Sequence, residues 1–336
     1  TQVYDSSSED EVIKSKETVI KKPSQPAKYD LYAFDYNWLI PNLTLRNSSG
    51  NGFGIGAGFS YLIRGFNKPN FAKKWTFGGV YYPSLQAFRL DAGFTFRHIL
   101  GLSDLHLRSR YTSLYDRYPF YYGIGNDTQF NRRQRIQRNT IDYDYVDFEV
   151  GLKRTFARKS MLENSLIIEN HDVSNRENRT VIDPTTNGLG SNTFFGLHSN
   201  LELDFTDNAL YPENGAQFDL SLKGRVDVDG NFTSNIDTRF SYFKTYNLGL
   251  RTTFIGSLHY KQANGNLAFY HLSRLGSQTN FRGYTRNRFI DKYAMLYNSE
   301  VRVLLGTIKT PLIRFVVGVF GFYDGGRVWN DSSEFY

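Results

Sequence analysis

Apolar and polar residues alternate along this chain in unusually long stretches, and this pattern limits the possible folds more than any other feature. In one stretch the apolar residues are Phe195, Leu197, Leu201, Leu203 and Phe205, and the polar residues between them include His198, Asn200, Glu202 and Asp204. Strict alternation indicates a β-strand with one apolar and one polar face. Most of these stretches run roughly ten to fifteen residues, well beyond the five or six of an ordinary strand.

The alternation predicts thirteen strands between residues 38 and 327, with ends good to a few residues. They are expected at residues 38–47, 53–65, 74–83, 87–99, 103–114, 142–156, 160–173, 192–206, 215–227, 232–247, 250–263, 292–306 and 313–327. Ten tilted residues suffice to cross a bilayer. We therefore expect an all-β protein, an antiparallel transmembrane β-barrel with an apolar outside and a polar lumen.

The amino-acid composition excludes several kinds of site, partner and fold. There is no cysteine, which excludes disulfides and thiolate metal sites. The net charge is +7, but the charges are spread singly along the strands, so nucleic acid is not an expected partner. Mean hydropathy is −0.47, a value that a barrel reaches because every second residue faces a polar lumen. A soluble β-sandwich is the alternative, but sandwiches have shorter strands and do not line a face with charge.

The connections and the N-terminal segment suggest how the chain is organised. Residues 1–34 are polar, charged and interrupted by proline, and are expected to form a tether before a barrel at residues 35–336. Long polar loops follow the fifth, seventh and eleventh predicted strands, whereas short turns follow the fourth and sixth. Outer-membrane barrels show this asymmetry, with long loops outside the cell and short turns in the periplasm.

An odd number of strands does not close a single-chain barrel in the usual way, because bacterial barrels have even numbers. An open edge in lipid leaves backbone groups without partners. Either the chain lacks C-terminal strands or another chain supplies them; the first interpretation is favoured.

Three segments carry a family resemblance. Leu275-Gly276 followed by Phe281-Arg282-Gly283-Tyr284 resembles the inner-loop motif of the BamA/TamA-type outer-membrane assembly barrels, also called bacterial surface antigen barrels. The segment from Phe320 to Trp329 resembles the wall strand that follows the motif, and Asp207 to Gly215 resembles the family's periplasmic turn. The resemblance implies a sixteen-stranded barrel with the motif loop between strands eleven and twelve, and hence that three strands are missing here.

The resemblance also implies roles for individual residues. Arg282 is expected to reach Glu300 and Asp324 on the lumen wall, because a guanidinium recognises carboxylates bidentately. Gly283 allows a sharp turn, and Tyr284 is expected to pack against the wall. Phe281 stands where the family has an aliphatic residue. The remaining motif residues are Gly276 in the loop and Asp207, Pro212 and Gly215 in the periplasmic turn.

No motif for catalysis appears in the sequence. The six histidines do not pair at metal-ligand spacing, and no nucleophile elbow or phosphate loop is present, so no enzyme activity, cofactor or metal site is expected. The family implies insertion or translocation of proteins at the bacterial outer membrane. Its partners would be outer-membrane lipid, unfolded outer-membrane proteins and accessory lipoproteins. The alternatives are an anchor barrel for a fused hydrolase, patatin-like or metallophosphoesterase-like, and a passive pore or receptor.

Overall fold

The structure is a computed structural model of the chain. It describes residues 2–4, 19–21, 36–48, 52–65, 70–84, 86–113, 121–128, 141–157, 159–174, 182–183, 185–277, 280–309 and 313–331. Most of the predicted tether lies outside these residues. Within it, β1 (Gln2–Tyr4) and β2 (Val19–Lys21) form a short parallel pair.

Thirteen long strands form one antiparallel sheet, which confirms the predicted fold class and strand number. They contain 10 to 17 residues each, long enough to cross a bilayer when tilted. Their bounds are β3 (Trp38–Ser48), β4 (Gly52–Ile63), β5 (Lys73–Tyr82), β6 (Ala87–Leu100), β7 (Ser103–Thr112), β8 (Asp142–Phe156), β9 (Ser160–Ser174), β10 (Gly190–Asp204), β11 (Gly215–Asp227), β12 (Phe232–Leu248), β13 (Leu250–Gly265), β16 (Tyr293–Lys309) and β17 (Arg314–Trp329).

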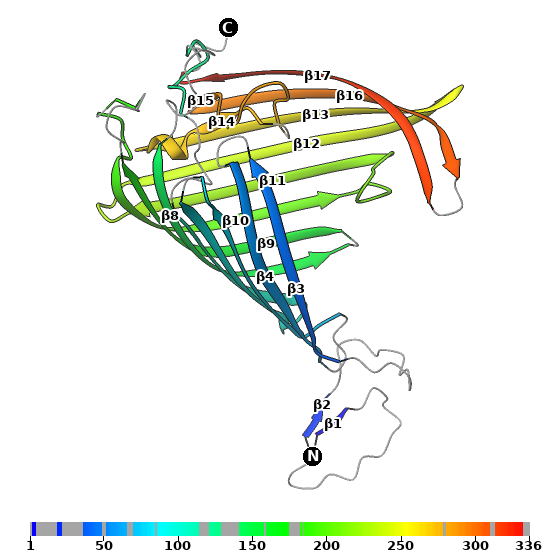
Figure 1. The fold of residues 1–336 in the computed structure, drawn as a ribbon, viewed down its shortest axis with the longest axis horizontal. Helices are drawn as coiled ribbons and strands as arrows, with labels where there is room; N and C mark the ends of the chain where they lie inside the picture. The colour runs from blue at the N-terminus through cyan, green and yellow to red at the C-terminus, as the bar shows by residue number, and fades with distance from the viewer. Residues whose placement is uncertain are drawn as a thin grey trace.

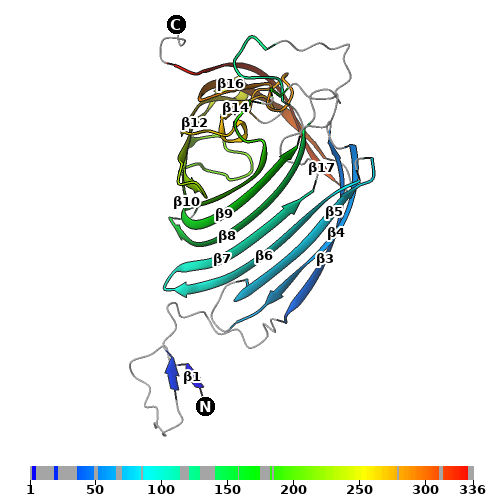
Figure 2. The ribbon, with the colours of Figure 1, turned by 90° about the vertical axis from the view of Figure 1, so that its left-hand side faces the viewer.

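Each strand of this sheet pairs with its neighbour in the sequence, apart from the excursion between β13 and β16. The sheet is strongly curved, with β3 in blue and β17 in red as its outermost strands (Figure 1, Figure 2). Among the described residues no pairing joins β3 to β17. The sheet therefore has the curvature of a barrel wall and two free edges.

The two faces of the sheet differ in chemistry. Along β9, buried and exposed residues alternate almost without exception, with Glu163, Ser165 and Glu169 on the concave face. Leu166 and Ile168 point to the convex face, where they are 64% and 42% exposed. Large exposed apolar side chains recur at such convex positions in the other strands. Because water disfavours an apolar surface of this extent, the convex face is suited to lipid.

The two ends of the sheet differ in the length of their connections. The long segments 113–141, 175–189 and 266–292 all leave from one end, which we call the long-loop end. The opposite end carries shorter connections, including Gly101 and Leu102, residues 157–159, and Gly249. This is the predicted asymmetry.

The chain between β13 and β16 folds back over the concave face at the long-loop end (Figure 1). It contains a 3-10 helix, η2 (Phe269–His271), and the small antiparallel pair β14 (Ser273–Leu275) and β15 (Phe289–Asp291). A buried apolar cluster fixes it to the wall; its members include Tyr143, Tyr145, Phe194, Phe269 and Tyr270. In the described part of the chain, no helix has the length and apolar character needed to cross a membrane.

Candidate functional site

The motif loop runs from β14 to β15 and is shaped by its own backbone contacts. Gly276 ends β14 with φ +109°, and a Cβ there would lie 2.3 Å from the carbonyl oxygen of Thr285. Only glycine fits such a position. The amide of Gly276 donates to Asn280 Oδ1 (3.1 Å), and its carbonyl accepts from the amide of Asn287 (3.1 Å). Hydrogen bonds within the loop therefore hold its shape independently of the contacts that its side chains make with the wall.

Arg282 joins this loop to two neighbouring strands of the wall. Its Nε and Nη2 donate to the two carboxylate oxygens of Asp324 on β17, at 2.9 and 2.7 Å. Its Nη1 donates to Glu300 Oε2 on β16 at 2.6 Å, and its backbone amide donates to Asp324 at 3.0 Å. The structure thus brings together the three residues that the sequence paired, in a bidentate geometry that lysine cannot reproduce.

Surrounding groups strengthen this contact, which we call the arginine clamp (Arg282, Glu300 and Asp324). The guanidinium lies over the ring of Phe322, with its central carbon 3.7 Å from the ring centroid, a favourable cation–π arrangement. Arg302 donates to the other oxygen of Glu300 at 2.6 Å. The hydrogen bond to Asp324 raises the pKa of Arg282 above its ordinary value, and the hydrogen bond to Glu300 adds a smaller rise. The Asp324 side chain is only 3% exposed, so the clamp neutralises a carboxylate that water barely reaches.

The aromatic residues of the motif divide between the wall and the loop. Phe281 is 6% exposed and packs with Leu275, Leu296 and Val328. Tyr284 was expected against the wall, but it is 46% exposed and lies against the rings of Phe281 and Phe289. The physical reason is that Phe281 fills the apolar space between β14, β16 and β17. Gly283 has φ +87°, so it makes the left-handed turn beside Arg282.

A second loop, residues 121–128, supports the motif loop, and no sequence pattern predicted this contact. Tyr122 accepts a hydrogen bond from Thr285 (3.1 Å), and Thr128 accepts from Arg288. Asn126 donates to the carbonyl of Val328 (2.6 Å) and accepts from its amide (3.1 Å). These partners lie more than 150 residues apart in the chain, so local spacing carries no signal for them.

The predicted periplasmic turn joins β10 to β11 and is organised by Asp207. The carboxylate of Asp207 accepts from the amide of Glu213 (3.0 Å) and from the amide of Asn214 (3.2 Å). Gly215 has φ +119°, and a Cβ there would lie 2.4 Å from the carbonyl oxygen of Phe205. Pro212 lies within the turn, just before the amides that Asp207 binds. The three predicted turn residues thus lie in one compact connection.

Protonation of Asp207 should loosen this turn. Hydrogen bonding from the amide of Glu213 lowers the pKa of Asp207 below its ordinary value of 3.8. The stabilising contribution is therefore complete above that value and is lost as pH falls through the lowered pKa. We expect the amides of Glu213 and Asn214 to exchange with deuterium faster in Asp207→Ala than in the wild type at neutral pH. Equal exchange in the two proteins would contradict this assignment.

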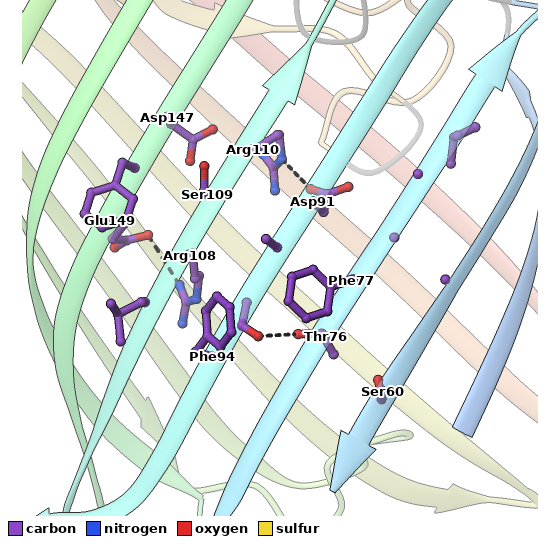
Figure 3. Close-up of a pocket in the computed structure, with 18 of the residues that line it drawn as sticks. Ser60, Thr76, Phe77, Asp91, Phe94, Arg108, Ser109, Arg110, Asp147 and Glu149 are labelled. Atoms are coloured by element: carbon purple, nitrogen blue, oxygen red, sulfur yellow. Dashed lines mark hydrogen bonds and ion pairs between the residues drawn. The ribbon is translucent and has the colours of Figure 1, made fainter. Parts of the chain in front are cut away.

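The concave face of β6, β7 and β8 carries paired charges (Figure 3). Arg110 on β7 donates to Asp91 on β6 at 2.8 Å, and Arg108 lies 3.5 Å from Glu149 on β8. A hollow of about 550 Å³ faces these side chains. Such pairs keep charged groups in a wet lumen without a large net field.

A known protein family matches much of this chain. The family model described as the Omp85 superfamily domain matches residues 107–335, more than half of the chain. The chain belongs to the Omp85 superfamily. The match begins in β7 and extends past β17, so it contains the arginine clamp, the motif loop and the Asp207 turn. Omp85 membership agrees with the curved antiparallel wall described above.

Two solved structures are similar to this chain, and the first of them supports the fold. BamA from Haemophilus ducreyi lacking POTRA domains 1–3 is similar with a TM-score of 0.62 and 15% identity, over 93% of this chain and 60% of the BamA chain. CdiB from Acinetobacter baumannii gives a TM-score of 0.46 and 11% identity, over 88% of this chain and 50% of the CdiB chain. The chain thus spans about 60% of the length of that BamA chain. No curated protein matches the sequence.

Proposed function

We propose that this chain forms the barrel of a bacterial outer-membrane protein that inserts or translocates other proteins. The arginine clamp carries the proposal, because it fixes an inward loop to two wall strands within an Omp85 fold. A passive pore needs a polar lumen but has no evident need for a loop held by three ionic groups.

The proposal gives the parts of the barrel separate tasks. The convex apolar face contacts outer-membrane lipid. Incoming strands of unfolded outer-membrane proteins pair with a free edge of the wall, since an exposed edge presents unpaired backbone groups to an extended chain. The clamp holds β16 and β17 in a fixed position relative to the loop. Accessory lipoproteins would bind outside the described wall.

Reconstitution of the natural full-length protein into liposomes tests the proposal. We expect it to accelerate the membrane insertion of an unfolded outer-membrane barrel over empty liposomes, and Arg282→Ala to reduce that acceleration. Arg251→Ala serves as the matched control, because Arg251 pairs with Glu213 at the end of the sheet opposite the long-loop end, away from the motif loop. Ion conductance without any acceleration would favour a passive pore, and hydrolase activity alone would favour an anchor barrel; either result would overturn the proposal.

A further inference from the structure

Two histidines and a glutamate from distant parts of the chain meet at the long-loop end. η2 places His271 over β9, where Glu169 and His171 point to the concave face. One ligand atom from each of the three lies within 4.8 Å of the others, and all three residues are buried. His171 Nε2 is 3.8 Å from Glu169 Oε2, and the two imidazole centroids are 5.4 Å apart.

His271 is the unexplained member of this cluster. It is 5% exposed, and neither ring nitrogen has a hydrogen-bond partner among the residues that the structure describes. Burying polar nitrogens without partners costs free energy. A neutral imidazole offers a lone pair, which is what a metal ion requires.

We propose that Glu169, His171 and His271 bind a divalent transition-metal ion, with zinc as the best fit. Two imidazoles and one carboxylate form a ligand set that zinc commonly takes in proteins, with a fourth position left for water. The Tyr143 hydroxyl lies 2.5 Å from His171 Nδ1. When Nδ1 is protonated and its N–H donates a hydrogen bond to the Tyr143 hydroxyl oxygen, the lone pair of Nε2 faces Glu169. Outer contacts of this kind fix the tautomer of metal-binding histidines.

The surroundings set both the access and the strength of the site. Glu169 lines the lumen hollow, which gives an ion a path from water. Arg225 and Lys223 bind the same carboxylate, at 2.6 and 3.1 Å. Their positive charges oppose a cation, so the affinity should be moderate and should respond to removal of either charge. A bound ion would tie η2, and with it the start of the motif loop, to β9.

Metal titration of the purified, folded full chain in detergent tests the proposal. The probes are zinc, counted by elemental analysis after desalting, and cobalt, followed by its visible absorption. We expect one ion per chain in the wild type and loss of binding in His271→Phe, whose ring keeps the packing against Phe194 and Tyr270. Lys223→Gln should bind about tenfold more tightly, because one opposing charge is gone.

Two further variants serve as controls. His98→Asn removes a histidine outside the cluster, at a residue with φ +51° that asparagine tolerates. His106→Phe removes the histidine of a second cluster of possible metal ligands, in which His106 lies beside Glu149 and Glu163. Both should bind the ion as the wild type does. If His271→Phe does not fold, His271→Gln and Lys223→Gln carry the test. A wild-type protein without stoichiometric metal, or binding that survives the loss of His271 or depends on His106, would overturn the proposal.

Discussion

Arg282→Ala is expected to lower the free energy of unfolding of the barrel by about 2 kcal/mol. Removing one partner of a buried ion pair typically costs about 3 to 5 kcal/mol, because the other charge stays buried and unpaired. The arginine itself is 23% exposed, which moderates the loss, and Glu300 keeps Arg302 as a partner. Asp324 loses its side-chain contacts from Arg282 and therefore carries most of the cost.

Guanidinium chloride unfolding of the folded barrel in detergent micelles measures this effect. Arg282→Lys should fall between alanine and the wild type, since an ammonium keeps the charge but not the bidentate geometry. Arg251→Ala removes an exposed arginine from an ion pair and should change stability by less than about 1 kcal/mol. Equal unfolding midpoints for Arg282→Ala and Arg251→Ala would show that the clamp adds nothing special to stability.

Gly276→Ala is expected to displace the motif loop and to cost about 2 to 4 kcal/mol. Two penalties combine at this residue. The backbone has φ +109°, and the new Cβ would meet the carbonyl oxygen of Thr285 at 2.3 Å. The oxygen belongs to the backbone of the same loop, so relief requires the loop to move. That movement would pull Arg282 away from Asp324.

Gly283→Ala is the matched control for this prediction. Gly283 has φ +87°, yet apart from its two chain neighbours no atom of the described residues lies within 4 Å of the added Cβ. Backbone strain alone should then lower the free energy of unfolding of Gly283→Ala, by about 1 kcal/mol. Unfolding midpoints measure both variants, and protease cleavage in residues 276–288 reports the position of the loop. Similar losses in the two glycine variants would contradict the steric argument.

The sequence predicted the wall well because each strand repeats the same physical rule. In β9, convex residues such as Leu166 must be apolar and concave residues such as Glu169 must be polar, so alternation alone marks the strand. The order of the strands followed, since every neighbour in this sheet is a neighbour in the chain or is joined across one inward loop. The juxtaposition of Arg282 with Glu300 and Asp324 followed from the strand count and the resemblance together.

What the sequence missed depends on contacts between segments that lie far apart in the chain. His171 and His271 are separated by a hundred residues, so no metal-ligand spacing reveals them. Asn126 reaches the backbone of Val328 only because the loop at residues 121–128 folds over β17. Tyr284 could not be placed from the motif, because its position depends on how far Phe281 enters the apolar space beside it. Such details belong to tertiary packing and not to local periodicity.

As a membrane wall, the sheet has lipid on its convex face and water on its concave face. The chain has no cysteine, so single cysteines can be introduced along β10 without interference. We would label positions 195, 197, 198 and 200 in the liposome-reconstituted protein. We expect brominated lipid to quench the labels at positions 195 and 197, and water-soluble thiol reagents to react with the cysteines at positions 198 and 200. A uniform response at all four positions would contradict it.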